Sequence, residues 1–171
     1  MRRKKGHRFI VSAAKEILSK HPNAHFVFAG DGAQLKNLEV QIKAENVSKN
    51  FHLLGLRKDM ANLLASADLF VLPTEQEALG TSYIEAMSFG LPIIGSNTGG
   101  VPEVVSHGNN GFLTDAGDIP ALTNAINALL GDEKLCQKMG GESRQRVSTL
   151  FHVDTMCAGM EALYRRLLKK F

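Results

Sequence analysis

The sequence predicts an α/β fold, a doubly wound, Rossmann-like parallel sheet of about five strands flanked by helices, with a helical segment at the C-terminal end. Three observations lead to this prediction. Short apolar runs alternate with segments of helical periodicity as far as about residue 114. Most of the runs end at turn residues, and beyond about residue 118 only helical periodicity remains. This alternation is typical of parallel sheets, because each connecting helix packs back over the sheet.

The individual elements follow from the same patterns in chain order. The first helix is predicted by an apolar stripe that starts at Phe9 and Ile10 and recurs at Ala13, Ala14 and Ile17. Short apolar runs that end at Gly, Pro, Asn or Asp predict strands over 25–29, 51–54, 68–72, 92–96 and 111–114. Helical periodicity predicts helices over 6–20, 33–45, 60–67, 81–89, 102–106, 118–130, 132–148 and 152–170.

Length and composition are those of one globular domain. The chain has 171 residues, of which 44% are hydrophobic and 22% charged, and no apolar run is long enough to cross a bilayer. These values exclude disordered, collagen-like and membrane-spanning chains. Because no linker rich in Pro, Gly or Ser interrupts the pattern, we predict a single domain over 1–171.

The first eight residues are strongly basic. They contain Arg2, Arg3, Lys4, Lys5, His7 and Arg8. A signal peptide is excluded because the apolar stretch that follows is short and Lys15 interrupts it. Without interleaved aromatic residues or zinc-ligand spacing we expect no nucleic-acid partner, and a solvated basic end stays the simple alternative. The cysteines Cys136 and Cys157 match no metal or disulfide pattern, so we expect them to be reduced and the protein to be cytoplasmic.

The turns after the strands are the places to look for a site, because ligands of open α/β sheets bind beyond the carboxyl ends of the strands. The richest of these turns is 73–80, which enters a helix through Gly80, Thr81 and Ser82. A helix start offers unpaired N–H groups and a positive dipole end, which suit a phosphate. Gly80 allows close approach of an anion, and the two hydroxyls supply further donors.

Two carboxylates flank this helix start, Glu77 on the loop and Glu85 in the helix, with seven residues between them. Carboxylates can accept hydrogen bonds from vicinal sugar hydroxyls. The alternative interpretation is a capping box, in which Ser82 and Glu85 only close the helix start. The residues alone favour the capping box.

Taken together and in order, the motifs resemble the C-terminal domain of the group 1 family of retaining glycosyltransferases, which have the two-domain B-type fold. The motifs that match are Lys5-Gly6, Phe28 to Gly32, Leu54-Gly55, Ala67 to Thr74, Glu77 to Gly80, Glu85 to Gly90, Pro92 to Val105, Gly108, and Gly111 to Leu113. The resemblance implies that Glu77 and Glu85 form the family's Glu-x7-Glu motif. Glu77 then holds hydroxyls of the donor sugar, Glu85 holds the ribose, and Lys5 neutralises the diphosphate.

The same resemblance implies the remaining contacts to the donor. The backbone N–H groups of Leu79, Gly80 and Thr81 meet the diphosphate, and backbone atoms around Leu56 and Arg57 border the base. The donor is a nucleoside diphosphate sugar of UDP or GDP type, with no metal ion and no other cofactor. A lysine and a helix dipole explain how the departing charge is stabilised without a metal.

The chain departs from the family pattern at three points. Ala78 and Leu79 replace a Gly-Phe pair, which predicts a difference in donor choice or affinity. The family's second diphosphate-binding arginine, five residues before the lysine, falls before Met1. The strand that carries it is also missing, and its place is between 26–29 and 69–72. Exposed strand edges predict association, so we expect a homodimer, with or without exchanged segments, or a sheet that has closed up.

We therefore expect the donor-binding half of a retaining glycosyltransferase that moves a hexose-like sugar, a truncated domain without its N-terminal acceptor domain and inactive alone. The alternative is a non-catalytic nucleotide-binding or assembly module awaiting a partner chain. A sugar-nucleotide epimerase is a weaker option, and an NAD-linked enzyme is disfavoured because no full Gly-rich dinucleotide motif follows a strand. For the full enzyme, a peripheral position at the inner membrane face is left open.

Overall fold

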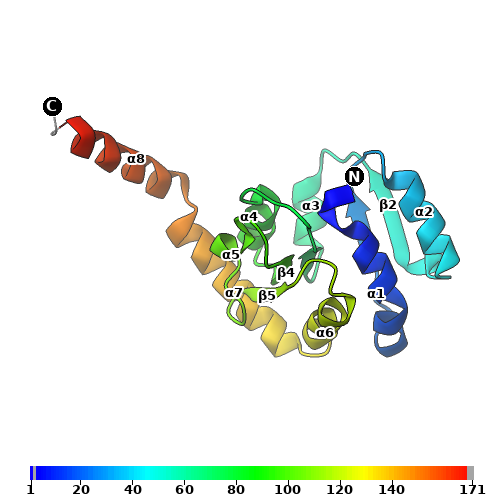
Figure 1. The fold of residues 1–171 in the computed structure, drawn as a ribbon. Helices are drawn as coiled ribbons and strands as arrows, with labels where there is room; N and C mark the ends of the chain where they lie inside the picture. The colour runs from blue at the N-terminus through cyan, green and yellow to red at the C-terminus, as the bar shows by residue number, and fades with distance from the viewer. Residues whose placement is uncertain (2, 169–171) are drawn as a thin grey trace.

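The computed structural model describes residues 1 and 3–168 and shows parallel β-structure flanked by helices (Figure 1). The strands are β1 (Phe26–Ala29), β2 (Phe51–Gly55), β3 (Phe70–Leu72), β4 (Ile93–Ser96) and β5 (Gly111–Thr114). The α-helices are α1 (His7–Lys20), α2 (Leu35–Ala44), α3 (Met60–Ala65), α4 (Thr81–Ser88), α5 (Val101–Val104), α6 (Ile119–Leu130), α7 (Glu133–Leu150) and α8 (Val153–Leu168). Two 3₁₀ turns, η1 (Arg3–Lys5) and η2 (Ser48–Asn50), complete the order. The predicted α/β class and about five strands are confirmed.

The five strands form two separate parallel sheets. One contains β1 and β2, with Phe26 opposite Phe51, and the other has the order β3-β4-β5, with Phe70 opposite Ile93. Within the described residues no ladder joins β1 to β3. The gap lies where the sequence predicts a missing strand, and the two flanking strands have not closed up.

The two faces of the second sheet are both covered. The neighbouring residues Ile93 and Ile94 of β4 point to opposite faces, and both are completely buried in different apolar clusters. In the first sheet Phe28 is buried, whereas Val27 beside it is 51% exposed. The double cover predicted for the sheet is therefore present at β4, and Val27 lacks it at β1.

Helix α1 joins the two sheets into one body. Its buried residues Val11, Ala14 and Ile17 belong to a cluster that contains Phe28 of β1 and Ile94 of β4. Helices α2 and α6 contact α1 on either side, as Figure 1 shows. Ala14 and Ile17 belong to the predicted apolar stripe, which thus packs into this cluster because its period places these side chains on one face, whereas Val11 was not part of the predicted stripe.

A second cluster covers the other face of the β3-β4-β5 sheet. The completely buried side chains that helices contribute to it include Tyr83 and Met87 of α4 and Val101 and Val104 of α5. Helix α7 packs against α4. The start of α4 is therefore held by core packing, which gives the loop before it a rigid support.

Helix α8 extends away from the rest of the molecule (Figure 1). None of its residues from Val153 to Leu168 is buried, and Val153, Met156, Met160 and Leu163 are exposed apolar side chains on it. Of the predicted helix over 152–170, Lys169 and Lys170 lie outside the described residues, as does Arg2 of the basic segment. No helix among the described residues is both long and apolar enough to cross a membrane.

The segment before α1 bridges the carboxyl ends of the two sheets. The carbonyl of Met1 accepts a hydrogen bond from the N–H of Gln34, just after β1, at 3.2 Å. The carbonyl of Lys4 accepts one from the N–H of Glu75, just after β3, at 2.7 Å. The basic segment is thus tied to the loop in which the sequence predicts a site.

Candidate functional site

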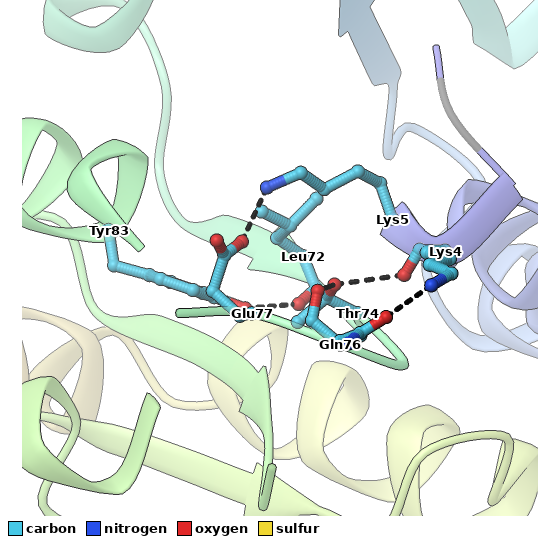
Figure 2. A network of polar contacts seen from close by, with 7 residues as sticks. All are labelled: Lys4, Lys5, Leu72, Thr74, Gln76, Glu77 and Tyr83. Atoms are coloured by element: carbon cyan, nitrogen blue, oxygen red, sulfur yellow. Dashed lines mark hydrogen bonds and ion pairs between the residues drawn. The ribbon is translucent and has the colours of Figure 1, made fainter. Parts of the chain in front are cut away.

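The loop 73–80 leaves the carboxyl end of β3 and enters α4, at the edge where ligands of α/β sheets bind. Figure 2 shows its contacts with the basic segment. The ammonium of Lys5 forms an ion pair with the carboxylate of Glu77, 72 positions away in the sequence. The Glu77 side chain is only 13% exposed and that of Lys5 34%. The two residues predicted as catalytic therefore lie together at the strand ends.

Two further contacts run beside this ion pair. The ammonium of Lys4 donates a hydrogen bond to the side-chain oxygen of Gln76, and the guanidinium of Arg8 pairs with Glu75 at 2.8 Å. Three consecutive loop residues are thus held by three basic residues. The basic segment is not only a solvated end, because it orders this loop.

Helix α4 begins without a side-chain cap. Its N-cap residue is Gly80, which has φ of +86°, and no side chain accepts a hydrogen bond at this end. The capping box proposed for Ser82 and Glu85 is therefore not formed. The first N–H groups of the helix are left for another partner, as an anion site requires. A Cβ atom at Gly80 would lie 2.4 Å from the ring of Tyr83, so glycine is needed here.

Tyr83 fixes the start of α4 to β3. Its buried hydroxyl donates a 2.6 Å hydrogen bond to the carbonyl of Leu72, the last residue of the strand. Burial raises the pKa of this phenol, and the charge of Glu77 raises it further. Tyr83 therefore stays a neutral donor, and its contact could not be anticipated from sequence spacing.

The turn after β4 also supports the loop 73–80. The N–H of Gly100 donates to the carbonyl of Glu77 at 3.4 Å. A Cβ atom at Gly99 would lie 1.8 Å from the same carbonyl oxygen, and one at Gly100 would lie 2.1 Å from that of Ala78. This supporting role was missed from the sequence. Two adjacent glycines were the available signal, since close approach of backbone to backbone requires them.

The other predicted residues lie at the start of α4, further along that helix, or after β2. Leu79 and Thr81 flank Gly80 and are exposed, and Glu85 is exposed on α4. Leu56 and Arg57 follow β2, where Arg57 pairs with Asp59 at 2.6 Å and lowers the pKa of that carboxyl. In the part of the chain that the structure describes, no hydrogen bond or ion pair joins Leu56, Arg57 or Glu85 to Lys5 or Glu77. A ligand that contacts all of these residues must therefore reach from the loop after β2 to the start of α4.

Three other features of the described residues were compared with the loop 73–80 as candidate sites. Among the described residues no group of three or more His, Cys, Asp or Glu side chains is placed to hold a metal ion. A surface hollow of about 480 Å³ lies at the far end of α1 and is lined by Lys15, Pro22 and Asn46, among others. It shares no residue with the loop 73–80.

Burial raises the pKa of the Cys136 thiol, so this cysteine is a poor nucleophile.

Curated relatives match most of the chain. An N-acetyl-alpha-D-glucosaminyl L-malate synthase of Bacillus anthracis is 32% identical over 160 residues, which cover 94% of this chain and 42% of the relative. The chain spans less than half the length of this relative and of a 2-deoxystreptamine N-acetyl-D-glucosaminyltransferase of Niallia circulans, of which it covers 38%.

Solved structures agree with this result. Anabaena HepE, in complex with UDP-glucose, superposes with a TM-score of 0.89 and 28% identity over 97% of this chain and 46% of its own. The C-terminal domain of a group 1 family glycosyl transferase from Francisella tularensis shares the fold, with a TM-score of 0.82 and 24% identity over 90% of this chain and 83% of its own. The family of glycosyl transferases group 1 matches residues 1–146, and the chain therefore belongs to this family, within which it has the fold of a C-terminal domain.

Proposed function

We propose that this chain is the donor-binding half of a retaining glycosyltransferase, which transfers a hexose-like sugar from a nucleoside diphosphate to an acceptor. One observation carries the proposal. The ion pair of Lys5 and Glu77 lies beside the uncapped start of α4, so a cation, a carboxylate and free N–H groups meet at the carboxyl ends of the strands. These groups suit a sugar diphosphate, since the N–H groups and the ammonium bind phosphate and the carboxylate accepts sugar hydroxyls.

The proposed contacts divide the donor among three loops. Lys5 and the N–H groups of Leu79, Gly80 and Thr81 bind the diphosphate. Glu77 binds the sugar hydroxyls, and Glu85 the ribose. Backbone atoms of Leu56 and Arg57, after β2, border the base. The UDP-glucose complex of the similar Anabaena protein supports a donor of this class.

When donor binds, the Lys5 ammonium must exchange its partner. In the structure it neutralises Glu77, and in the proposed complex it neutralises phosphate. The charge that develops on the departing diphosphate is then stabilised by Lys5 and by the α4 dipole, without a metal ion. Glu77, released from the ion pair, is free to accept hydrogen bonds from the sugar.

The acceptor half of the site belongs, in this proposal, to an N-terminal domain or a partner chain. The chain spans less than half of these two curated relatives. The exposed apolar side chains of α8 offer a surface for such a partner, as do the edges of β1 and β3 that pair with no other described strand. A homodimer through the same surfaces is the second form that we propose. Either way, the chain alone has no transferase activity.

Calorimetric titration with UDP, GDP and uridine tests the proposal. We expect binding of one of the two diphosphates in the micromolar to millimolar range and weaker binding of the nucleoside, because Lys5 and α4 contact phosphate. Binding must weaken in Glu85→Ala. Absence of binding by the unmutated chain to both diphosphates would contradict a donor site.

A second candidate is a non-catalytic nucleotide-binding or assembly module. It is favoured by the exposed apolar side chains of α8, which offer a surface for assembly. A sugar-transfer assay with UDP-hexose distinguishes the two. Transfer that appears only when an N-terminal domain of a relative is added supports the enzyme half, whereas nucleotide binding without transfer in that mixture supports the module.

A further inference from the structure

Thr74 is the most enclosed polar residue at the candidate site. It lies two residues after β3 and is completely buried. Its hydroxyl is 2.9 Å from the carbonyl oxygen of Lys4 and 3.0 Å from that of Gln76 (Figure 2). These two residues directly precede Lys5 and Glu77. One side chain therefore links the backbone on both sides of the ion pair.

The chemistry of a hydroxyl suits this position. It has one proton, which it can donate to either carbonyl or share between the two, and it brings no charge of its own. Elsewhere in the core, the buried hydroxyls of Ser96, Thr114 and Thr123 have no hydrogen-bond partner among the described residues. A buried hydroxyl with two acceptors is thus a distinct arrangement here, and its removal leaves the Gln76 carbonyl without this contact.

The Lys4 carbonyl has a second donor, the N–H of Glu75 at 2.7 Å. Loss of the Thr74 hydroxyl would therefore loosen the connection between the basic segment and the loop without removing it. The fold can survive such a change while the relative position of Lys5 and Glu77 shifts. This separates a role in the site from a role in folding.

We infer that Thr74 is a positioning residue, which sets Lys5 against Glu77 and so prepares the ammonium for a diphosphate. The choice of a diphosphate as ligand rests on the proposed function, whereas the contacts of Thr74 are independent of it. Thr74 touches no ligand in this arrangement. It acts through the backbone of the two residues that do.

The test compares Thr74→Val, which removes the hydroxyl but keeps the shape, with Thr74→Ser, which keeps the hydroxyl. We expect about three- to tenfold weaker UDP binding in the valine variant, the usual range for one lost hydrogen bond, and nearly unchanged binding in the serine variant. Uridine affinity should stay constant, because the base and ribose contacts are elsewhere. Thr123→Val, at a buried hydroxyl in α6 that has no partner among the described residues, is the matched control and should bind UDP normally.

Three results would overturn the inference. They are unchanged UDP binding in Thr74→Val, equal weakening in Thr74→Ser, and an equal loss of uridine affinity. Circular dichroism establishes that each variant is folded, and Thr74→Ala replaces the valine variant if that one is not.

A second measurement needs no ligand. The rate at which acetic anhydride modifies Lys5, relative to Lys20 on the exposed surface of α1, reports how well Glu77 holds the Lys5 ammonium. We expect the ratio of the Lys5 rate to the Lys20 rate to rise in Thr74→Val and to equal that of the unmutated chain in Thr74→Ser. An unchanged ratio contradicts the inference. If the ratio changes while the unmutated chain binds no diphosphate, the proposed function fails and the positioning role of Thr74 stands.

Discussion

Lys5 and Glu77 form an ion pair across 72 positions of sequence. The lysine ends a 3₁₀ turn before α1, and the glutamate lies on the loop that leads into α4. The backbone hydrogen bond from Glu75 to Lys4 and the contacts of Thr74 place the two segments side by side. The pair thus connects the segment before α1 with the loop before α4, and both segments carry proposed contacts to the donor.

Replacement of Lys5 by alanine should weaken UDP binding about tenfold, the effect of one charge-assisted contact to phosphate. Uridine binding should not change. Lys20→Ala is the control, because Lys20 also pairs with a glutamate, Glu16 at 3.8 Å, but lies at the other end of α1. Isothermal titration calorimetry measures the UDP and uridine affinities of the unmutated chain and of both variants. Equal losses of UDP affinity in the two variants would show a nonspecific charge effect.

Replacement of Glu77 by glutamine should separate the nucleotide from the sugar. The change removes the charge that competes with phosphate for Lys5 but leaves the Thr74 contacts that position the Lys5 backbone, so UDP binding should stay equal or become tighter. Binding of a UDP-hexose should gain less from its sugar, since an amide is a weaker acceptor than a carboxylate. A parallel loss of affinity for UDP and UDP-hexose would be inconsistent with a sugar-binding role for Glu77.

Replacement of Gly99 by alanine should lower the free energy of unfolding by at least about 2 kcal/mol, because φ is +53° and the new Cβ meets the Glu77 carbonyl at 1.8 Å. At Gly141, inside α7, a Cβ atom would meet no other part of the described chain within 4 Å. Gly141→Ala should instead be neutral or stabilise by up to about 1 kcal/mol, because alanine favours helix. Urea unfolding measures both, and similar values for the two variants would contradict the described packing.

Replacement of Tyr83 by phenylalanine should cost about 1 kcal/mol, the net value of one buried hydrogen bond. The Leu72 carbonyl keeps a second donor, the N–H of Thr74 at 2.8 Å, which limits the cost. Tyr164→Phe, on exposed α8, should leave stability unchanged. Thermal unfolding measures both variants, and we expect the lower midpoint in Tyr83→Phe. A lower midpoint in Tyr164→Phe would contradict the prediction.

His7 should make stability depend on pH. Burial, together with the positive charges of the chain's amino group and Lys5, lowers the pKa of His7 from 6.5 to about 4. Between pH 4 and pH 6.5 the unfolded chain carries a proton on His7 that the folded chain does not, so the free energy of unfolding rises with pH. It reaches its full value with respect to His7 above about pH 6.5. It decreases by roughly 3 kcal/mol as the pH falls to 4. Urea unfolding of the unmutated chain and of His7→Gln at several pH values measures the slope, which the variant should have lost.

Much of the fold could be predicted from local pattern. The predicted strand over 51–54 corresponds to Phe51–Gly55 and the predicted helix over 6–20 to His7–Lys20, because an apolar period reports directly which face is buried. The predicted strand over 68–72 is shorter in the structure and begins at Phe70. The 3₁₀ turns Arg3–Lys5 and Ser48–Asn50 were missed, since three residues are too few to show a period.

The candidate residues could be chosen from the sequence, whereas their arrangement in space could not. Local motifs and family resemblance singled out Lys5, Glu77 and Gly80, because residue type and spacing are properties of the sequence itself. The ion pair, the absence of a cap on α4, and the contacts of Thr74 and Gly99 depend on segments that are far apart along the chain. The same holds for the separation of the strands into two sheets, which depends on which strands pair. The sequence alone determined the elements and the candidate residues, and only tertiary packing, which brings distant backbone groups within hydrogen-bonding range, decided how they meet.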